Sequence, residues 1–187
     1  WLDSEPDRDR FDLRLAYDAP KGGLIAGLIG AKSTVRARIF GKGGWSRWDG
    51  VAHATQDGRT LAAFQIGSRS GLFRIAGQAR PGALVTGTAA QAIGPALSLL
   101  YDGRLADSTL DGRLRLAGDA FKLAAKGKFV LSENRAEALN VRARVLKPER
   151  VLSAPELAGV ALDATLDGPL SDLAIDHVLT VDRLRLG

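Results

Sequence analysis

The stretch Val141-Arg142-Ala143-Arg144-Val145 decides the fold, because apolar and cationic side chains take turns along it. Successive side chains of a β-strand point to opposite faces, so this order predicts a strand with one apolar and one wet face. The same pattern recurs along the chain, which predicts a set of half-buried antiparallel strands. It is found at 11–17, 35–39, 113–116, 160–166 and 183–186.

Less regular strands are predicted at 46–54, 61–67, 72–78, 83–89, 121–131 and 173–180. Pairs of Asp followed by Gly favour tight hairpins, since both residues tolerate positive φ. We therefore expect turns at Asp49-Gly50, Asp57-Gly58, Asp102-Gly103, Asp111-Gly112 and Asp167-Gly168. Hairpin after hairpin predicts an antiparallel meander.

Helix is expected only in short pieces. Pro95–Tyr101 predicts one turn of helix, and Pro148–Leu152 predicts another, because proline is tolerated in the first turn. The predicted fold class is all-β, an elongated antiparallel meander with at most one or two short helices.

The composition sets further limits. With 187 residues, 45% hydrophobic and 25% charged, the chain predicts one folded β-rich segment, with a weak subdivision near 90–103. Met is absent even at position 1 and the last residues read as an unfinished strand, so we expect an internal fragment of a longer, repeat-like protein. The longest apolar run, Leu24–Ala31, is far shorter than the ~20 residues of a membrane-spanning helix.

Catalytic, cofactor and metal sites are not indicated by any motif. Cys is absent, and the two histidines, His53 and His177, lie far apart in strand-like segments without further ligands at defined spacing. The segment 26–33 has alanine at both glycine positions of a P-loop. We expect neither an enzyme nor a bound cofactor.

The positive net charge raises the question of whether the chain binds nucleic acid. A net charge of +5 and the Trp45-Ser-Arg-Trp48 stretch are compatible with base stacking. However, the arginines of the alternating segments are dispersed along the sheet by its pleat, whereas a nucleic-acid groove concentrates cations with aromatics. We expect no nucleic-acid partner.

Residues 155–187 combine alternating strands with Leu-x-Gly boundaries, and Arg113–Gly118 and Lys126–Leu131 have a similar style. They resemble the repeats of the TamB family, the inner-membrane component of the translocation and assembly module, and of the broader AsmA-like group. The resemblance covers residues 100–187, and residues 1–99 share only the general alternating pattern. One departure is Ser171-Asp172, where the family pattern has a proline nearby.

The resemblance implies a long sheet curled into an open trough that is lined with aliphatic side chains. It also implies a periplasmic location in a Gram-negative bacterium, as part of an inner-membrane-anchored protein that works with an outer-membrane barrel protein of the Omp85/TamA type. The implied roles are phospholipid transport between the two membranes, and assembly or secretion of outer-membrane proteins.

An apolar sheet face must be covered by something. In a trough, part of it stays available to phospholipid acyl chains, at about 0.8 kcal/mol per buried methylene. The predicted floor of this lipid groove consists of Leu114, Leu116, Phe121, Leu123, Val141, Val145, Val160, Leu162, Leu166, Leu184 and Leu186.

Other interpretations remain open from the sequence. The same residues also suit the core of a β-sandwich or solenoid with an adhesion or structural role and no lipid. An outer-membrane barrel is disfavoured, because aromatic girdles are hard to build with 6% aromatic residues.

Overall fold

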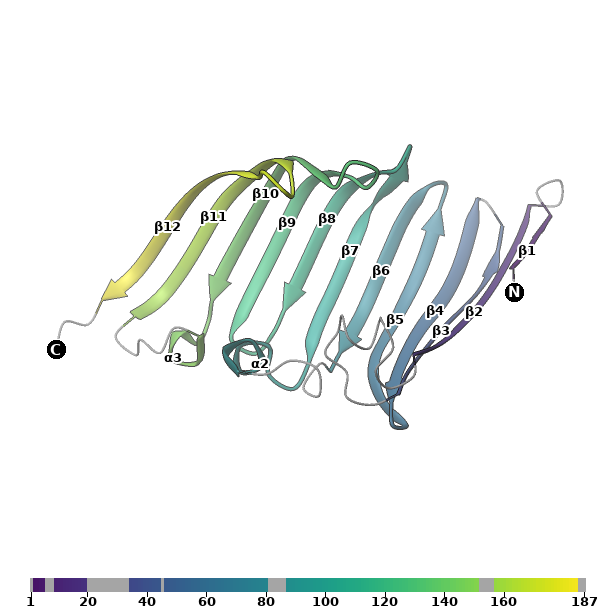
Figure 1. Ribbon diagram of the computed structural model, residues 1–187, viewed down its shortest axis with the longest axis horizontal. Coiled ribbons are helices and arrows are strands. Elements are labelled where there is room, and N and C mark those ends of the chain that lie inside the picture. Colours follow the sequence, from purple (N-terminus) through teal and green to yellow (C-terminus); the bar gives the residue numbers. More distant parts are fainter. Residues whose placement is uncertain are drawn as a thin grey trace.

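A single antiparallel sheet makes up nearly all of the structure. The computed structural model describes residues 2–5, 9–19, 34–44, 46–80, 87–151 and 157–184. Within them, twelve strands pair strictly in chain order, and the first and last strands lie at opposite ends of the molecule (Figure 1). The strands are β1 (Leu2–Glu5), β2 (Arg10–Ala19), β3 (Val35–Gly43), β4 (Arg47–Gln56), β5 (Arg59–Arg69), β6 (Leu72–Ala79), β7 (Leu97–Ala106), β8 (Thr109–Ala117), β9 (Phe121–Val130), β10 (Arg135–Val145), β11 (Leu157–Pro169) and β12 (Ala174–Leu184).

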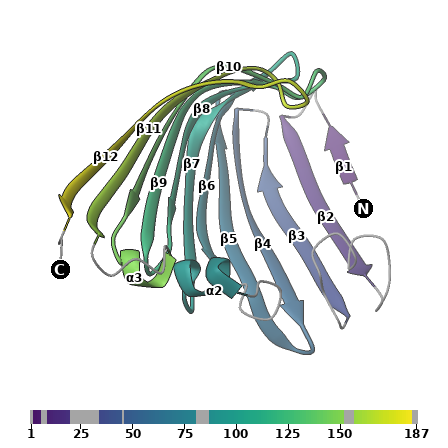
Figure 2. The ribbon, with the colours of Figure 1, turned by 60° about the vertical axis from the view of Figure 1, so that its left-hand side comes forward.

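The sheet is curled and open. Figure 2 shows the strands bending along their length, with the β1 and β12 edges apart. No second sheet lies on either face in the part of the chain that the structure describes. The predicted all-β meander in the form of an open trough is confirmed, and a closed sandwich is not formed by these residues.

Two short helices lie at the same end of the strands (Figures 1 and 2). They are α2 (Gly87–Ile93), between β6 and β7, and α3 (Pro148–Val151), between β10 and β11. The prediction of helix from Pro148 is confirmed. The helix predicted at Pro95–Tyr101 is wrong, because α2 ends at Ile93, Gly94 follows it with φ of +71°, and β7 begins at Leu97. Proline often stands just after such a helix end rather than inside a helix.

The predicted strand at 83–89 is wrong where it can be compared. Its last residues, from Gly87, belong to α2, and residues 81–86 lie outside the described residues, as do 20–33. The P-loop-like segment and the apolar run Leu24–Ala31 therefore fall in a region of which nothing is described. The strands β6 and β7, on either side of α2, pair directly with each other.

Residues that are directly opposite on neighbouring antiparallel strands share a face, so the register sorts the side chains. Leu114 is opposite Tyr101 and Ala125, and Ala125 is opposite Val141. Continuing across all strands, one face carries mainly apolar residues and the other mainly charged ones. We call them the apolar face and the polar face. Along β9 the exposure alternates from Phe121 to Phe129, with the apolar-face residues the less exposed.

A β-bulge in β10 keeps the apolar residues on one face. Ala136 and Leu139 are three residues apart, yet both face the apolar side, because the register shifts between them against β9 and β11. Ala138 has φ of +46° in this bulge. Its amide donates to Asp167 Oδ1 at 3.1 Å, and its carbonyl accepts from Asn140 Nδ2 at 2.9 Å. Side chains thus satisfy the backbone groups that the bulge removes from the ladder.

Four of the five predicted Asp-Gly turns are wrong. Only Asp57-Gly58 forms a turn, with φ of +48° and +78°, whereas the other pairs lie inside β4, β7, β8 and β11. Hairpins instead turn at Ser70-Gly71 and Asp107-Ser108, where φ is also positive.

Glycines inside strands make room for aromatic rings. A Cβ built on Gly41 or Gly50 would run into the ring of Trp48, and one on Gly112 would lie 3.0 Å from Cε2 of Tyr101. The rings therefore lie flat on the apolar face over neighbouring strands. These glycines are needed for their missing side chain, not for a turn.

The trough has little fully enclosed core. The buried apolar residues are few, and no large side chain is completely buried among the described residues. Those buried are Val35, Trp48, Leu61, Ala120, Ala136, Val160 and Ala164. A sheet of one layer shields its apolar face mainly by curvature and by its own side chains.

Asp119 joins the two helices at their end of the sheet. Its amide donates to the Ile93 carbonyl at 2.9 Å, and its carboxylate pairs with Lys147 at 2.6 Å and with Arg150. The hydrogen bond from Lys147, with the positive charges of Lys147 and Arg150, holds the pKa of Asp119 below its usual value despite partial burial. The helices α2 and α3 also contact each other directly.

Candidate functional site

Nine of the predicted groove residues lie together on the apolar face of β8 to β11. Leu116, Leu123, Ala143 and Leu162 are successive cross-strand neighbours and form one row. The next row contains Leu114 and Val141. The nine are Leu114, Leu116, Phe121, Leu123, Val141, Val145, Val160, Leu162 and Leu166.

The last two predicted groove residues are not placed with the others. The backbone of Leu184 pairs with Leu157 at the end of β12, but its side chain is outside what the structure describes. Leu186 lies outside the described residues.

The apolar face is accessible to solvent, most of all at its edges. Leu15 on β2 is 51% exposed and Leu179 on β12 is 61% exposed. Leu114, Leu116 and Leu123, in the middle of the sheet, are half-buried. An uncovered apolar surface on this scale is unusual in a soluble domain and is typical of surfaces that bind a ligand or partner.

The size of the sheet suits a long flexible apolar ligand. With strands about 4.8 Å apart, twelve of them span roughly 50 Å. One acyl chain occupies half of the ~30 Å hydrocarbon core of a bilayer, so it extends over about three strands. The groove is long enough for a ligand to bind at successive positions along it.

The apolar face continues into β2 to β7, which the sequence reading did not include in the groove. Here aromatic rings join the aliphatic side chains: Phe11 and Trp48 contact each other, with ring centroids 6.1 Å apart. The alternation at 11–17 and 35–39 was a sufficient signal that these strands share the face. No feature of the sequence predicts that the aromatic rings lie over glycines.

Two polar atoms are buried on this aromatic part without a hydrogen-bond partner among the described residues: Trp48 Nε1 and the Tyr101 hydroxyl. Burial raises the pKa of the Tyr101 phenol, and the negative charge of Asp111 adds to the effect. The raised pKa keeps the Tyr101 phenol neutral at physiological pH.

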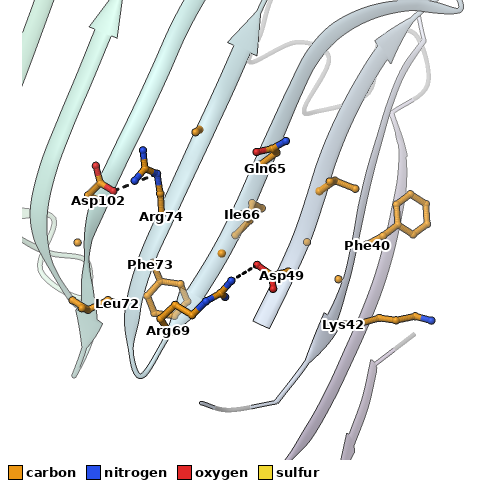
Figure 3. Close-up of a pocket in the computed structure, with 16 residues that line it drawn as sticks. Phe40, Lys42, Asp49, Gln65, Ile66, Arg69, Leu72, Phe73, Arg74 and Asp102 are labelled. Carbon is orange, nitrogen blue, oxygen red and sulfur yellow. Dashed lines mark hydrogen bonds and ion pairs between the residues drawn. The ribbon is translucent and has the colours of Figure 1, made fainter. Parts of the chain in front are cut away.

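The polar face carries a separate hollow, drawn in Figure 3, between β3 and β7. Two cross-strand ion pairs border it: Arg69 with Asp49 at 2.7 Å, and Arg74 with Asp102 at 3.7 Å. The hydrogen bond from Arg69 lowers the pKa of Asp49, assisted by the charges of Arg69 and Arg47. A carboxylate held ionised as Asp49 is makes a poor proton donor, and both ion pairs join adjacent strands, so the arrangement fits cross-strand stabilisation.

Metal-ligating side chains do not gather anywhere in the described residues. His53 lies on the polar face opposite Arg38, whereas His177 lies on the apolar face opposite Ala164. Trp48 is 7% exposed, which leaves no open ring for base stacking, and Trp45 is outside the described residues.

The comparisons with known proteins found no match among protein-family models, curated proteins or solved structures. None of the helices in the described ranges is long and apolar enough to cross a membrane.

Proposed function

We propose that this chain is a non-catalytic, periplasmic segment of a TamB- or AsmA-like protein, and that its apolar face carries phospholipid between the inner and outer membranes. Other parts of the full protein would anchor it in the inner membrane and engage an outer-membrane barrel of the Omp85/TamA type. The observation that supports the proposal is a continuous apolar face, one layer thick, with no covering layer among the described residues.

The chemistry of the face fits acyl chains. Its rows consist of Leu, Val, Ala and aromatic residues, so a tail gains about 0.8 kcal/mol for each methylene it buries. Directional polar contacts would hold a ligand at one place, and the row through Leu116, Leu123, Ala143 and Leu162 offers none. A tail bound by apolar contact alone can move along the trough.

The test is lipid retention by purified protein. The delipidated wild type is incubated with phospholipid, separated from free lipid, and its bound lipid is measured by mass spectrometry. We expect wild type to retain phospholipid, and Leu116→Asp and Leu162→Asp to lose most of it, since each places a charge in the same row of the groove.

The matched control is Val178→Asp, an apolar-to-acid change on the polar face of β12, where Val178 is 64% exposed. It should retain lipid as wild type does. Circular dichroism establishes that each variant keeps its sheet. A folded wild type that binds no lipid would overturn the proposal and favour a structural or adhesion module.

Assembly or secretion of outer-membrane proteins is a second candidate, favoured by the β12 edge. This strand is paired on one side only within the described residues, and its side chains from Ala174 to Val181 are all exposed. Such an edge can accept an extended strand of another chain. A photocrosslinker at Thr180 should capture a purified, urea-unfolded outer-membrane barrel protein, whereas one at Ala63, inside the sheet, should not.

A further inference from the structure

Of the seven exposed cations on the polar face of β8 to β10, Lys128 lies opposite Asp111 and Glu137, and the other six crowd together. They surround Ala124, an exposed small residue at the centre of β9. We call this group the basic patch; it consists of Arg113, Arg115, Lys122, Lys126, Arg142 and Arg144.

The register places like charges directly against each other in this patch. Arg113 is opposite Lys126, and Lys122 is opposite Arg144. Like charges in directly opposite positions destabilise a sheet. Their repulsion is an unfavourable feature of the free protein that a bound anion would relieve.

The cations of β3 to β6 are arranged differently. Arg36 pairs with Asp18 at 3.1 Å and Arg69 with Asp49 at 2.7 Å. Of the six in the basic patch, only Arg142 has an ion pair in the described part of the chain, with Asp163 at 2.6 Å. The patch therefore has positive charge available for a partner, whereas Arg36 on β3 and Arg69 on β5 are already ion-paired.

The shape of the patch favours a broad anionic surface over a single small anion. The side chains border two shallow hollows, one with Arg113, Lys126 and Arg142 in its lining and the next with Lys122 and Arg144. The residues of these strands that face the polar side include no aromatic ring, so bases have no stacking platform.

We propose that the basic patch binds the phosphate headgroups of an anionic phospholipid bilayer, and so lays the polar face of β8 to β10 on a membrane surface. Clusters of four to eight cations are typical of such contacts. Next to the patch, the same face turns acidic at Asp163, Asp167 and Asp176. Asp102 and Asp111 lie on the other side of the patch, so acidic side chains that an anionic surface would repel confine the contact to the patch itself. The apolar face stays free, so this inference stands or falls independently of lipid transport.

The experiment is co-sedimentation of the protein with phosphatidylglycerol-rich vesicles and with pure phosphatidylcholine vesicles. We expect wild type to bind the anionic vesicles only. Binding should disappear as salt approaches about 1 M, where the Debye length is about 3 Å. The triple variant Arg113→Gln/Lys126→Gln/Arg144→Gln should lose on the order of 100-fold in affinity, given the contribution of each cation near an anionic surface.

The matched control is Arg36→Gln/Arg47→Gln/Arg69→Gln, which removes the same charge from ion-paired positions on β3 to β5. It should change vesicle affinity by less than about tenfold, because these groups lie beyond a Debye length from the patch. An equal loss in both triple variants would overturn the proposal, since binding would then follow net charge alone.

Two further outcomes discriminate. Replacing Arg113 and Arg144 by lysine should preserve vesicle binding, because a bilayer surface is recognised by charge. Loss of binding in this variant would overturn the proposal that the patch binds a bilayer, and would indicate a site that recognises one phosphate through the geometry of the arginine guanidinium groups. Binding to single-stranded DNA or inorganic pyrophosphate without binding to anionic vesicles would overturn it as well. Neutralising the patch should leave the melting temperature equal or higher, which shows that lost binding is not lost folding.

Discussion

The apolar face is built from two different kinds of side chain along its length. In β2 to β7 aromatic rings lie flat across glycines, as Trp48 does over Gly41 of the neighbouring strand β3 and Gly50 of its own strand β4. In β8 to β12 branched aliphatic side chains stand in rows, with Phe121 and Phe129 at the two ends of β9. We call these the aromatic half and the aliphatic half.

The difference shows that one alternating pattern can produce either a self-covered or an open surface. Trp48 is only 7% exposed although no second layer lies above it, because the ring rests on the sheet itself. The leucine rows have no such partner, so ligand atoms can reach between them. We therefore expect the aromatic half to contribute stability and the aliphatic half to contribute binding.

The largest expected effect is that of Trp48→Ala, which should lower the free energy of unfolding by about 3–5 kcal/mol. Leu114→Ala, on the half-buried aliphatic floor, should cost about 1 kcal/mol. Urea denaturation followed by circular dichroism measures both. Equal losses would remove the distinction between the two halves.

Glycine substitutions test whether aromatic rings cover the sheet in the aromatic half. Gly41→Ala should destabilise by about 1–3 kcal/mol, because its Cβ collides with the Trp48 ring. In a Trp48→Ala background most of that penalty should vanish, so a double-mutant cycle reports strong coupling. Additive losses would show that the ring does not rest on Gly41.

In the aliphatic half, Gly127→Ala should destabilise in every background. Its φ is +152°, and a Cβ there would lie 2.8 Å from the Leu139 Cα across the bulge, where no side chain can move away. Gly67→Ala is the control, since its nearest contact is an ordinary 3.6 Å; the free energy of unfolding should change by no more than about 0.5 kcal/mol.

The bulge gives a smaller effect. Asp167→Ala removes the acceptor of the Ala138 amide and should cost about 1 kcal/mol. Asp163→Ala breaks only an exposed ion pair with Arg142 and should cost about 0.5 kcal/mol or less. Hydrogen exchange by NMR should show loss of protection at Ala138 in the first variant alone.

The smallest effect concerns Asp119, which ties α2, near the aromatic half, to α3, near the aliphatic half. Its pKa is lowered in the folded state, so its stabilisation is present above the unfolded value of about 3.9 and is lost as pH falls through the folded pKa. Wild type should melt slightly above Asp119→Asn at pH 6, with the gap closing in acid. A gap that is constant with pH would contradict this assignment.

The strands and the face of each residue could be predicted because period-two alternation is a local property. In a meander, neighbours in the chain are neighbours in space, so Leu116 and Leu162 could be assigned to one face from the pattern alone. The nine described groove residues are together on that face for this reason. Whether lipid occupies them is a separate question, which the retention assay addresses.

The turns, the strand β7 and the bulge could not be predicted, because they depend on contacts between strands that the local pattern does not contain. Asp-Gly pairs favour turns, but Gly103 and Gly112 are needed where Tyr101 lies across the sheet. β7 was missed because Pro95 suggested a helix start, although Gly94 already ends one. The bulge at Ala138 interrupts the alternation, and only the opposing strands reveal that Leu139 stays on the apolar face.

The strict pairing of each strand with its chain neighbours has a consequence for how such a molecule can grow. Its energy is close to a sum over adjacent pairs, as in repeat proteins, so folding can propagate strand by strand from any stable hairpin. Duplicating two strands together leaves every later strand with the same direction and with the same side chains on the apolar face. Duplicating a single strand reverses the direction of every strand that follows it. Evolution can therefore lengthen this architecture in hairpin units without redesigning what lies on either side.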